Sequence, residues 1–471
     1  MTKLAVLSDI HYYSPLLGVS GRAYELRSGS DQKCLAESGA VTDETFKRLI
    51  NSDVNAVLIA GDITNDGEKS SHDGIFEKLC FLNEKKPVYL ITSTHDWCSD
   101  GNARRYEGEN TCRDVETVSK EELNGIYAVF GEKRVIASYK TNTGFYSRVY
   151  QVSPSLRLIA VNDDGDGANG ASGYSDAHMA WMKEQLRDAK SAGVDVIAME
   201  HHLVLHGING LVNGSQSIAD KEKRAAELAD AGLRLIITGH SHMLRTTEFI
   251  SPAGNRLTQL NAGSLCGYPA PITYITVENG SAHIKTEFLD GFTYNGKKYD
   301  GEFFREHTAG VIIRLLHAAA TDKKELSGRL AADGIRIKQL DRLYPLIRLA
   351  SRKAQRVSVG SAGKFINSLT FGKGIDKKAL NAVKDEKLLK TVTDVFLCVF
   401  DGSHTACSMS KELKTVVTQV SALPGKAVSR LPLNKEKKEK IYKITDAVKA
   451  TAQELMYPSP PDNLECEISL C

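Results

Sequence analysis

Long apolar runs are absent from this chain of 471 residues. No stretch approaches the roughly 18 consecutive apolar residues that a membrane-spanning helix needs. The first apolar run begins at Leu4 and is interrupted by Asp9, which is too soon for the core of a signal peptide. The apolar fraction of 42% and the charged fraction of 25% are typical of globular proteins. We therefore expect a cytoplasmic protein.

Cysteine is scarce, and its spacing shows no pairing. The nine cysteines are an odd number and contain no Cys-x-x-Cys pair. This pattern argues against a disulfide framework. Without an export signal, reduced thiols in a cytoplasm are the simplest account of them.

A strong net charge is also missing, because 60 basic and 58 acidic residues give a formal charge of +2. The distribution is uneven, with an acidic excess before residue 300 and a basic excess after it. A basic segment is typical either of an anionic partner or of a solvated helical surface. Peripheral contact with a membrane through the basic C-terminal helices is one form of the first alternative. Nucleic acid fits less well, because the basic half lacks interleaved aromatic residues.

The chain does contain an alternation of short apolar runs and helical patterns. Five runs rich in Val, Ile and Leu have the length of buried strands, and they lie within residues 3–11, 56–64, 88–96, 195–202 and 233–242. Helical patterns at 43–52, 72–84 and 175–193 separate several of them. The alternation predicts an α/β domain over residues 1–295. The helical patterns that follow predict an all-α domain of unknown role over residues 296–471.

Residues of the kinds that bind metals follow each of the five predicted strands. They are Asp9 and His11, Asp62, His95 and Asp96, His201 and His202, and His240 and His242. Pairs spaced by two residues share one side of a continuing strand, and ligands collect beyond the carboxyl ends of strands in an open α/β sheet. A lone histidine at a strand end is usually an ordinary surface or hydrogen-bonded residue. Five such ends together predict a divalent transition-metal site, because imidazole and carboxylate are its usual ligands.

The order of these residues resembles the calcineurin-like metallophosphoesterase superfamily, most closely the branch with cyclic-nucleotide phosphodiesterases and purple acid phosphatases. The resemblance rests on Asp9-x-His11, GDITNDGE at 61–68, STHD at 93–96, EHH at 200–202 and GHSH at 239–242. It implies a four-layer αββα sandwich followed by the all-α domain. It also implies two metal ions and hydrolysis of a small-molecule phosphomonoester or phosphodiester by a hydroxide that the metals activate.

The resemblance also implies a role for each motif residue. The first metal would be held by Asp9, His11 and His242, the second by His201 and His240, and both by Asp62. The family ligand precedes a proline by two positions. Leu203 occupies that proline position here, and His201 rather than His202 is the implied ligand. His95 takes the position of the general acid, and Asp96 that of the carboxylate that orients it.

One position departs from the family pattern. Thr94 stands where the family has an asparagine that gives an amide oxygen to the second metal, and a hydroxyl is a weaker neutral donor. Either Thr94 coordinates poorly, a water replaces the amide, or the second metal is loosely held. With so much imidazole we expect Mn, Fe, Zn or Co. The alternative function is a scaffold or binding protein that kept the fold and lost turnover, and only the change at Thr94 supports it.

Overall fold

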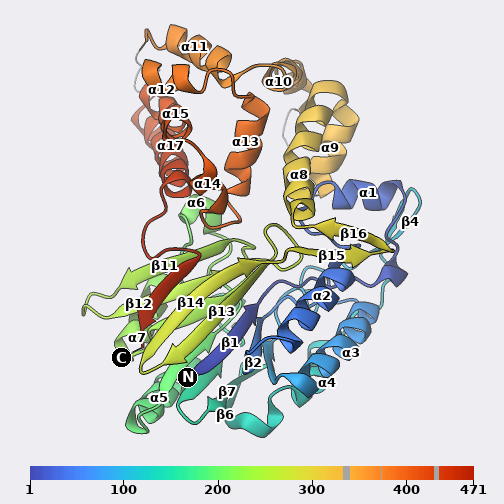
Figure 1. Ribbon diagram of the computed structural model, residues 1–471, viewed down its shortest axis with the longest axis vertical. Coiled ribbons are helices and arrows are strands. Elements are labelled where there is room, and N and C mark those ends of the chain that lie inside the picture. The colour runs from blue at the N-terminus through green and yellow to red at the C-terminus, as the bar shows by residue number, and fades with distance from the viewer. Residues whose placement is uncertain (333–339, 373, 429–433, 471) are drawn as a thin grey trace.

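The computed structural model describes residues 1–332, 340–372, 374–428 and 434–470. Two β-sheets form the centre of the N-terminal part, and helices cover them. The helices that follow residue 301 stand together at one end of the molecule (Figure 1). Among the described residues, no helix has the length and apolar character needed to cross a membrane.

The first sheet has six strands in the order β17-β14-β13-β1-β2-β3. Strands β1, β2 and β3 are parallel, whereas β13 is antiparallel to β1. Their bounds are β1 Thr2–Leu7, β2 Ala56–Ala60, β3 Val88–Ile91, β13 Pro271–Glu278, β14 Ser281–Phe288 and β17 Glu465–Ser469. Helices α2 (Ser38–Ile50) and α3 (Lys69–Lys85) share one apolar cluster with this sheet and cover its outer face.

The second sheet has seven strands in the order β11-β12-β10-β9-β8-β7-β6, and β8, β9, β10 and β12 run parallel. Their bounds are β6 Val135–Lys140, β7 Tyr146–Ser153, β8 Leu156–Ala160, β9 Asp195–Met199, β10 Leu235–Thr238, β11 Leu244–Ile250 and β12 Arg256–Ala262. Helices α5 (Asp176–Ser191) and α7 (Lys221–Asp230) pack on its outer face through Met182 and Leu228. The remaining short elements of this part are α1 Arg22–Ser28, β4 Arg105–Glu107, β5 Asn110–Cys112, α4 Lys120–Ile126 and α6 Gly210–Asn213.

A third apolar cluster joins the inner faces of the two sheets. Leu58 of β2 packs there with Leu158 of β8 and Ile237 of β10, and all three are fully buried. Burial on both faces explains why these strands read as continuous apolar runs. The predicted four-layer αββα arrangement is therefore confirmed.

The C-terminal region begins with the hairpin β15 (Gly291–Tyr294) and β16 (Lys297–Asp300) and is then helical. Its helices are α8 Glu302–Thr321, α9 Lys323–Ala332, α10 Leu340–Ala354, α11 Val359–Leu369, α12 Lys377–Ala382, α13 Leu388–Leu397, α14 His404–Ser408, α15 Lys411–Ser421, α16 Leu423–Val428 and α17 Lys435–Met456. The predicted helical character is confirmed for these elements.

The end of the chain departs from the helical pattern. Strand β17 returns to the first sheet and pairs antiparallel with β14, with Ser469 opposite Ser281 (Figure 1). The helical region also packs on the sheets, because Phe304 of α8 and Leu397 of α13 belong to the cluster that covers the first sheet. Residues 296–471 are thus tied to the N-terminal part at several points.

Candidate metal centre

The predicted ligands lie just beyond the ends of neighbouring strands. Strands β1, β2 and β3 are adjacent in the first sheet, and β9 and β10 are adjacent in the second. Because the two sheets pack face to face, the residues that follow these strands meet at one edge of the sandwich. Among the described residues, four groups of side chains are each close enough to share one ion. Two of them contain all the predicted ligands except Thr94, a third links His11, Asp62 and His95, and the fourth consists of Asp163, Asp164 and His202.

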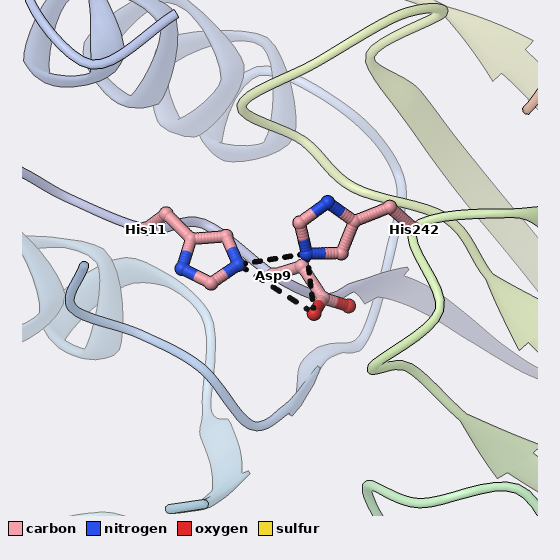
Figure 2. A group of neighbouring side chains, drawn as sticks. All are labelled: Asp9, His11 and His242. Atoms are coloured by element: carbon pink, nitrogen blue, oxygen red, sulfur yellow. Dashed lines mark hydrogen bonds and ion pairs between the residues drawn. The ribbon is translucent and has the colours of Figure 1, made fainter. Parts of the chain in front are cut away.

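The first group contains Asp9, His11 and His242 (Figure 2). The Nε2 atoms of His11 and His242 lie 2.9 Å apart. Oδ1 of Asp9 lies 3.4 Å from Nε2 of His242 and 3.7 Å from Nε2 of His11. Three potential donor atoms therefore face one point.

The second group contains Asp62, His201 and His240. Nε2 of His201 lies 3.0 Å from Oδ2 of Asp62 and 3.3 Å from Nδ1 of His240. Nδ1 of His201 donates to the carbonyl of Ala60 at 2.7 Å, which leaves the lone pair of Nε2 directed at the group. Oδ2 of Asp62 also lies 4.0 Å from Nε2 of His11, so Asp62 stands between the two groups.

The chemistry of these donors fits a pair of divalent cations. Burial, together with the nearby charge of Lys33, lowers the pKa of His11 well below its usual value. Burial and the neighbouring His202 do the same to the pKa of His240. Burial lowers the pKa of His201, but Asp62 outweighs it and the net shift is upward, so His201 pairs with this carboxylate. The Nε2 atoms of His11 and His242 lie within hydrogen-bond distance of each other. The same nitrogen and oxygen atoms are the donors that a divalent transition-metal ion takes.

The backbone at these positions is strained. Asp9, His11, Asp62, His240 and His242 have φ values of 51°, 44°, 51°, 65° and 58°. Residues other than glycine rarely adopt this left-handed region, and such residues cluster at functional sites at a cost on the order of 1–3 kcal/mol each. Strand β1 ends at Leu7, so the turn that follows it, and not the strand, sets the directions of the Asp9 and His11 side chains.

The expectation that each pair of residues spaced by two shares one side of a strand is wrong for His240 and His242, which join different groups.

His95 lies on the open side of the centre, and its orienting partner differs from the predicted one. Nδ1 of His95 lies 3.0 Å from Oδ1 of Asp66, and 30% of its side chain is exposed. Burial and Lys33 lower the pKa of His95, but Asp62 and Asp66 outweigh them, and the net shift is upward. Asp66 follows Asp62 by four residues in GDITND, and only the turn of this loop brings it to His95.

Asp96, which the family resemblance assigned to orienting His95, is directed elsewhere. Its carboxylate accepts hydrogen bonds from the backbone amides of Thr64 at 2.8 Å and Ser93 at 2.9 Å. Burial, reinforced by the charge of Asp62, raises the pKa of Asp96 to about 7. Asp96 therefore joins the turns after β2 and β3, and the assignment of the orienting role is corrected to Asp66.

Two further candidates lie at the margin of the second group. Thr94 lines a cavity together with His95 and His240. His202 points away from Asp62, because its Nδ1 lies 3.0 Å from Oδ2 of Asp163. The structure thus places His201, not His202, with the second group.

The segment NDDGDG, residues 162–167, contains none of the predicted ligands, but its aspartates support the centre. Asp164 accepts hydrogen bonds from Oγ of Ser93 and from Nε1 of Trp97, both at 3.1 Å. The signal was available, since this segment follows β8 and ends at the same edge as the other strand ends. Its side chains hold the segment that carries Thr94 and His95.

Gln32 is a second residue that the sequence did not reveal. Its side-chain amide lies 2.6 Å from Nδ1 of His242, while Oε1 has no hydrogen-bond partner. When His242 binds a cation through Nε2, Nδ1 carries the proton and requires an acceptor. A 180° turn of the amide, which exchanges atoms of nearly equal size, presents Oε1 to that proton. A Cβ atom on residue 267 would lie 2.5 Å from Oε1, so Gly267 makes room for this contact.

The helical C-terminal region holds the segment that carries Gln32. The carbonyl of Gly29 accepts hydrogen bonds from Nε of Arg314 in α8 at 2.9 Å and from Nη1 of Arg329 in α9 at 3.3 Å. Nε2 of His307 in α8 donates to the carbonyl of Asp31 at 3.1 Å. The C-terminal region therefore supports the first donor group, even though it contributes no member to it.

We predict that Gln32→Leu weakens divalent metal binding by roughly 10- to 100-fold, because His242 loses the acceptor that fixes its tautomer. Competition of manganese or zinc between the protein and a fluorescent chelator measures the affinity. Gln32→Glu retains an acceptor oxygen and should keep most of the affinity. Equal metal binding by Gln32→Leu and the unsubstituted protein would show that Gln32 does not orient His242.

A known protein family matches the N-terminal part of the chain. The family model described as calcineurin-like phosphoesterase matches residues 2–244, and no curated protein matches the chain. Among solved structures, a dimetal phosphatase from Danio rerio is 11% identical with a TM-score of 0.44, over 61% of this chain and 96% of that one. A purple acid phosphatase from yellow lupin is 11% identical with a TM-score of 0.37, over 64% and 52% of the two chains. The family match shows that the chain belongs to the calcineurin-like phosphoesterases, a family of metal-dependent phosphoester hydrolases.

Proposed function

We propose that this protein hydrolyses a phosphomonoester or phosphodiester of a small molecule, with His95 as the general acid. The observation that carries the proposal is the pair of donor groups that meet at Asp62, with the Asp66–His95 pair beside them. The ligands are Asp9, His11 and His242 for one ion, His201 and His240 for the other, and Asp62 for both, and Thr94 lies next to the second group. When bound, two such cations neutralise the phosphate and supply the attacking solvent nucleophile.

The protein's own side chains account for the proton that the leaving group needs. Asp66 accepts the hydrogen on Nδ1 of His95, which directs Nε2 toward the centre and favours the protonated imidazole. Nε2 of His95 then donates its proton to the oxygen of the departing alcohol. Lys33, which is 6% exposed, places a positive charge near His11 and His95, where it favours binding of an anion.

A scaffold without turnover is the competing function. Its only support is Thr94, whose hydroxyl is a weaker ligand than the amide that the family has at this position. The other six predicted ligands meet in two groups, and His95 retains a carboxylate partner. The left-handed backbone at five of these positions serves to place the donor groups, and His95 with Asp66 is the feature that turnover requires beyond metal binding.

The central test is hydrolysis of an aryl phosphate and an aryl phosphodiester in the presence of manganese. We expect turnover of at least one ester, and a decrease in kcat of roughly 10²- to 10⁴-fold for His95→Ala because the leaving group loses its acid. Asp62→Asn should abolish turnover and lower the metal content, because it removes the charge shared by both ions. His283→Ala, on the outer sheet surface, serves as the control. Absence of metal and of turnover in the unsubstituted protein would favour the scaffold.

The pH profile tests the Asp66–His95 pair. The charge of Asp66 raises the pKa of His95, and the general acid works only while protonated, that is, below this pKa. In Asp66→Asn the pKa falls, so the decrease of kcat on the alkaline side should begin at a lower pH. Asp188→Asn on the exposed face of α5 should leave the profile unchanged. If kcat depends on pH in the same way in Asp66→Asn and in the unsubstituted protein, Asp66 does not raise the pKa of His95.

The occupancy of the second metal tests position 94. Thr94→Asn restores an amide oxygen, and we expect it to tighten the weaker of two metal-binding steps by about tenfold, a typical effect of a ligand-shell change. Titration calorimetry with manganese and elemental analysis after gel filtration measure both steps. If Thr94→Asn leaves both binding steps unchanged, position 94 does not contribute to the second site.

A further inference from the structure

A cavity of about 370 Å³ opens beside the candidate metal centre. Thr94, His95 and His240 form its inner wall, so it begins at the second donor group. The alcohol that leaves during hydrolysis must lie next to the acid that protonates it. Because His95 lines this cavity, the cavity is the place for the leaving group.

Hydroxyl groups supply much of the remaining wall. They belong to Ser99, Ser172, Ser215 and Ser217. Ser172 Oγ lies 3.2 Å from Nε2 of His202, which is also part of the wall. Within the described part of the chain, the hydroxyls of Thr94, Ser99 and Ser215 form no hydrogen bond to another residue. These groups are therefore available to a ligand.

Backbone hydrogen bonds hold the segment that carries one of these hydroxyls, that of Ser217. The amide of Leu203, which follows His202, donates to the carbonyl of Gln216 at 3.0 Å. The amide of Ile218 donates to the carbonyl of Leu203 at 2.9 Å, which fixes Ser217 between them. Donors and acceptors fixed in advance cost less entropy when a ligand binds.

The wall is poorly suited to two common leaving groups. Among the described residues that line the cavity there is no Phe, Tyr or Trp, so no such ring stacks on a nucleobase. The lining residues that the structure describes also include no Lys or Arg, and the carboxylate of Asp100 accepts hydrogen bonds from Asn102, so the wall offers no guanidinium or ammonium group to pair with a second phosphate.

We propose that the leaving group is a polyhydroxylated alcohol, such as a sugar or a cyclic polyol, which binds in this cavity through the serine and threonine hydroxyls and Asp100. The inference rests on the proposed hydrolysis and narrows its substrate class. A volume of about 370 Å³ is at the small end of ligand sites and accommodates one six-membered ring.

The test compares two esters with the same ring and different hydroxylation, myo-inositol 1-phosphate and cyclohexyl phosphate, each as the monoester and as the methyl diester. We expect kcat/KM to favour the inositol ester by roughly 10- to 100-fold, because two or three hydrogen bonds to the ring are lost in the cyclohexyl ester. Adenosine 5′-phosphate and an aryl phosphate complete the panel.

Variants link the preference to the cavity. In the double variant Ser99→Ala and Ser215→Ala, the ratio of kcat/KM for the inositol and cyclohexyl esters should fall at least severalfold toward one. Ser191→Ala, on the exposed end of α5, should leave the ratio unchanged. Because the ratio is measured on one protein preparation, a partial loss of folded protein does not alter it.

The outcomes separate this inference from the proposed function. Hydrolysis of the aryl ester without preference for the inositol ester over the cyclohexyl ester overturns the polyol class and leaves the phosphoesterase intact. An inositol preference that survives in the double variant overturns the assignment of the cavity. Failure to hydrolyse any ester, with metal bound, overturns the proposed function and this inference with it.

Discussion

The structure of this protein depends on a cluster of imidazole nitrogens and carboxylate oxygens that face one another in a buried space. Two imidazole nitrogens lie 2.9 Å apart beside one carboxylate, and a second carboxylate stands between this group and the next. Five residues of the centre adopt a left-handed backbone to reach these positions. Backbone strain and buried polar groups of this kind persist only when something compensates for them. Divalent cations would do so, and the fold is arranged to receive them.

Both the two-sheet sandwich and the helical C-terminal region hold the donor groups in position. The two sheets fix the positions of the strand ends, because their inner faces are packed by fully buried side chains such as Leu58 and Leu158. The helices α8 and α9 hold the segment before Gln32 through three hydrogen bonds to its carbonyls. The C-terminal region is therefore connected to the first donor group through the side-chain amide of Gln32, which contacts His242. The helices α8 and α9 thus help to position a residue of the centre. Their sequence, which is rich in basic and apolar residues, does not predict this role.

The ligands could be predicted from the sequence because each follows an apolar run, and the ends of neighbouring strands must meet. The partner of His95 could not, because Asp66 and Asp96 are both close to it in sequence and only the shapes of two turns decide between them. Gln32 lies in an irregular segment, and contacts with helices about 280 residues later bring it to His242. Strand β17 was missed for another reason. Cys466 and Ile468 do alternate with the exposed Glu465, Glu467 and Ser469, but an alternation of only five residues is too short to stand out as a strand.

The two donor groups differ in how far they are enclosed, and Thr94 lies on the open side of the second group. The first group is enclosed, with Asp9 and His11 fully buried and Gln32 behind His242. The second group borders the hydroxyl-lined cavity, and Thr94 lies where the two meet. Ser93 cannot replace the missing amide, because its hydroxyl already donates to Asp164. In the proposed function, position 94 therefore bears both on the hold of the second ion and on the cavity in which the leaving group would lie.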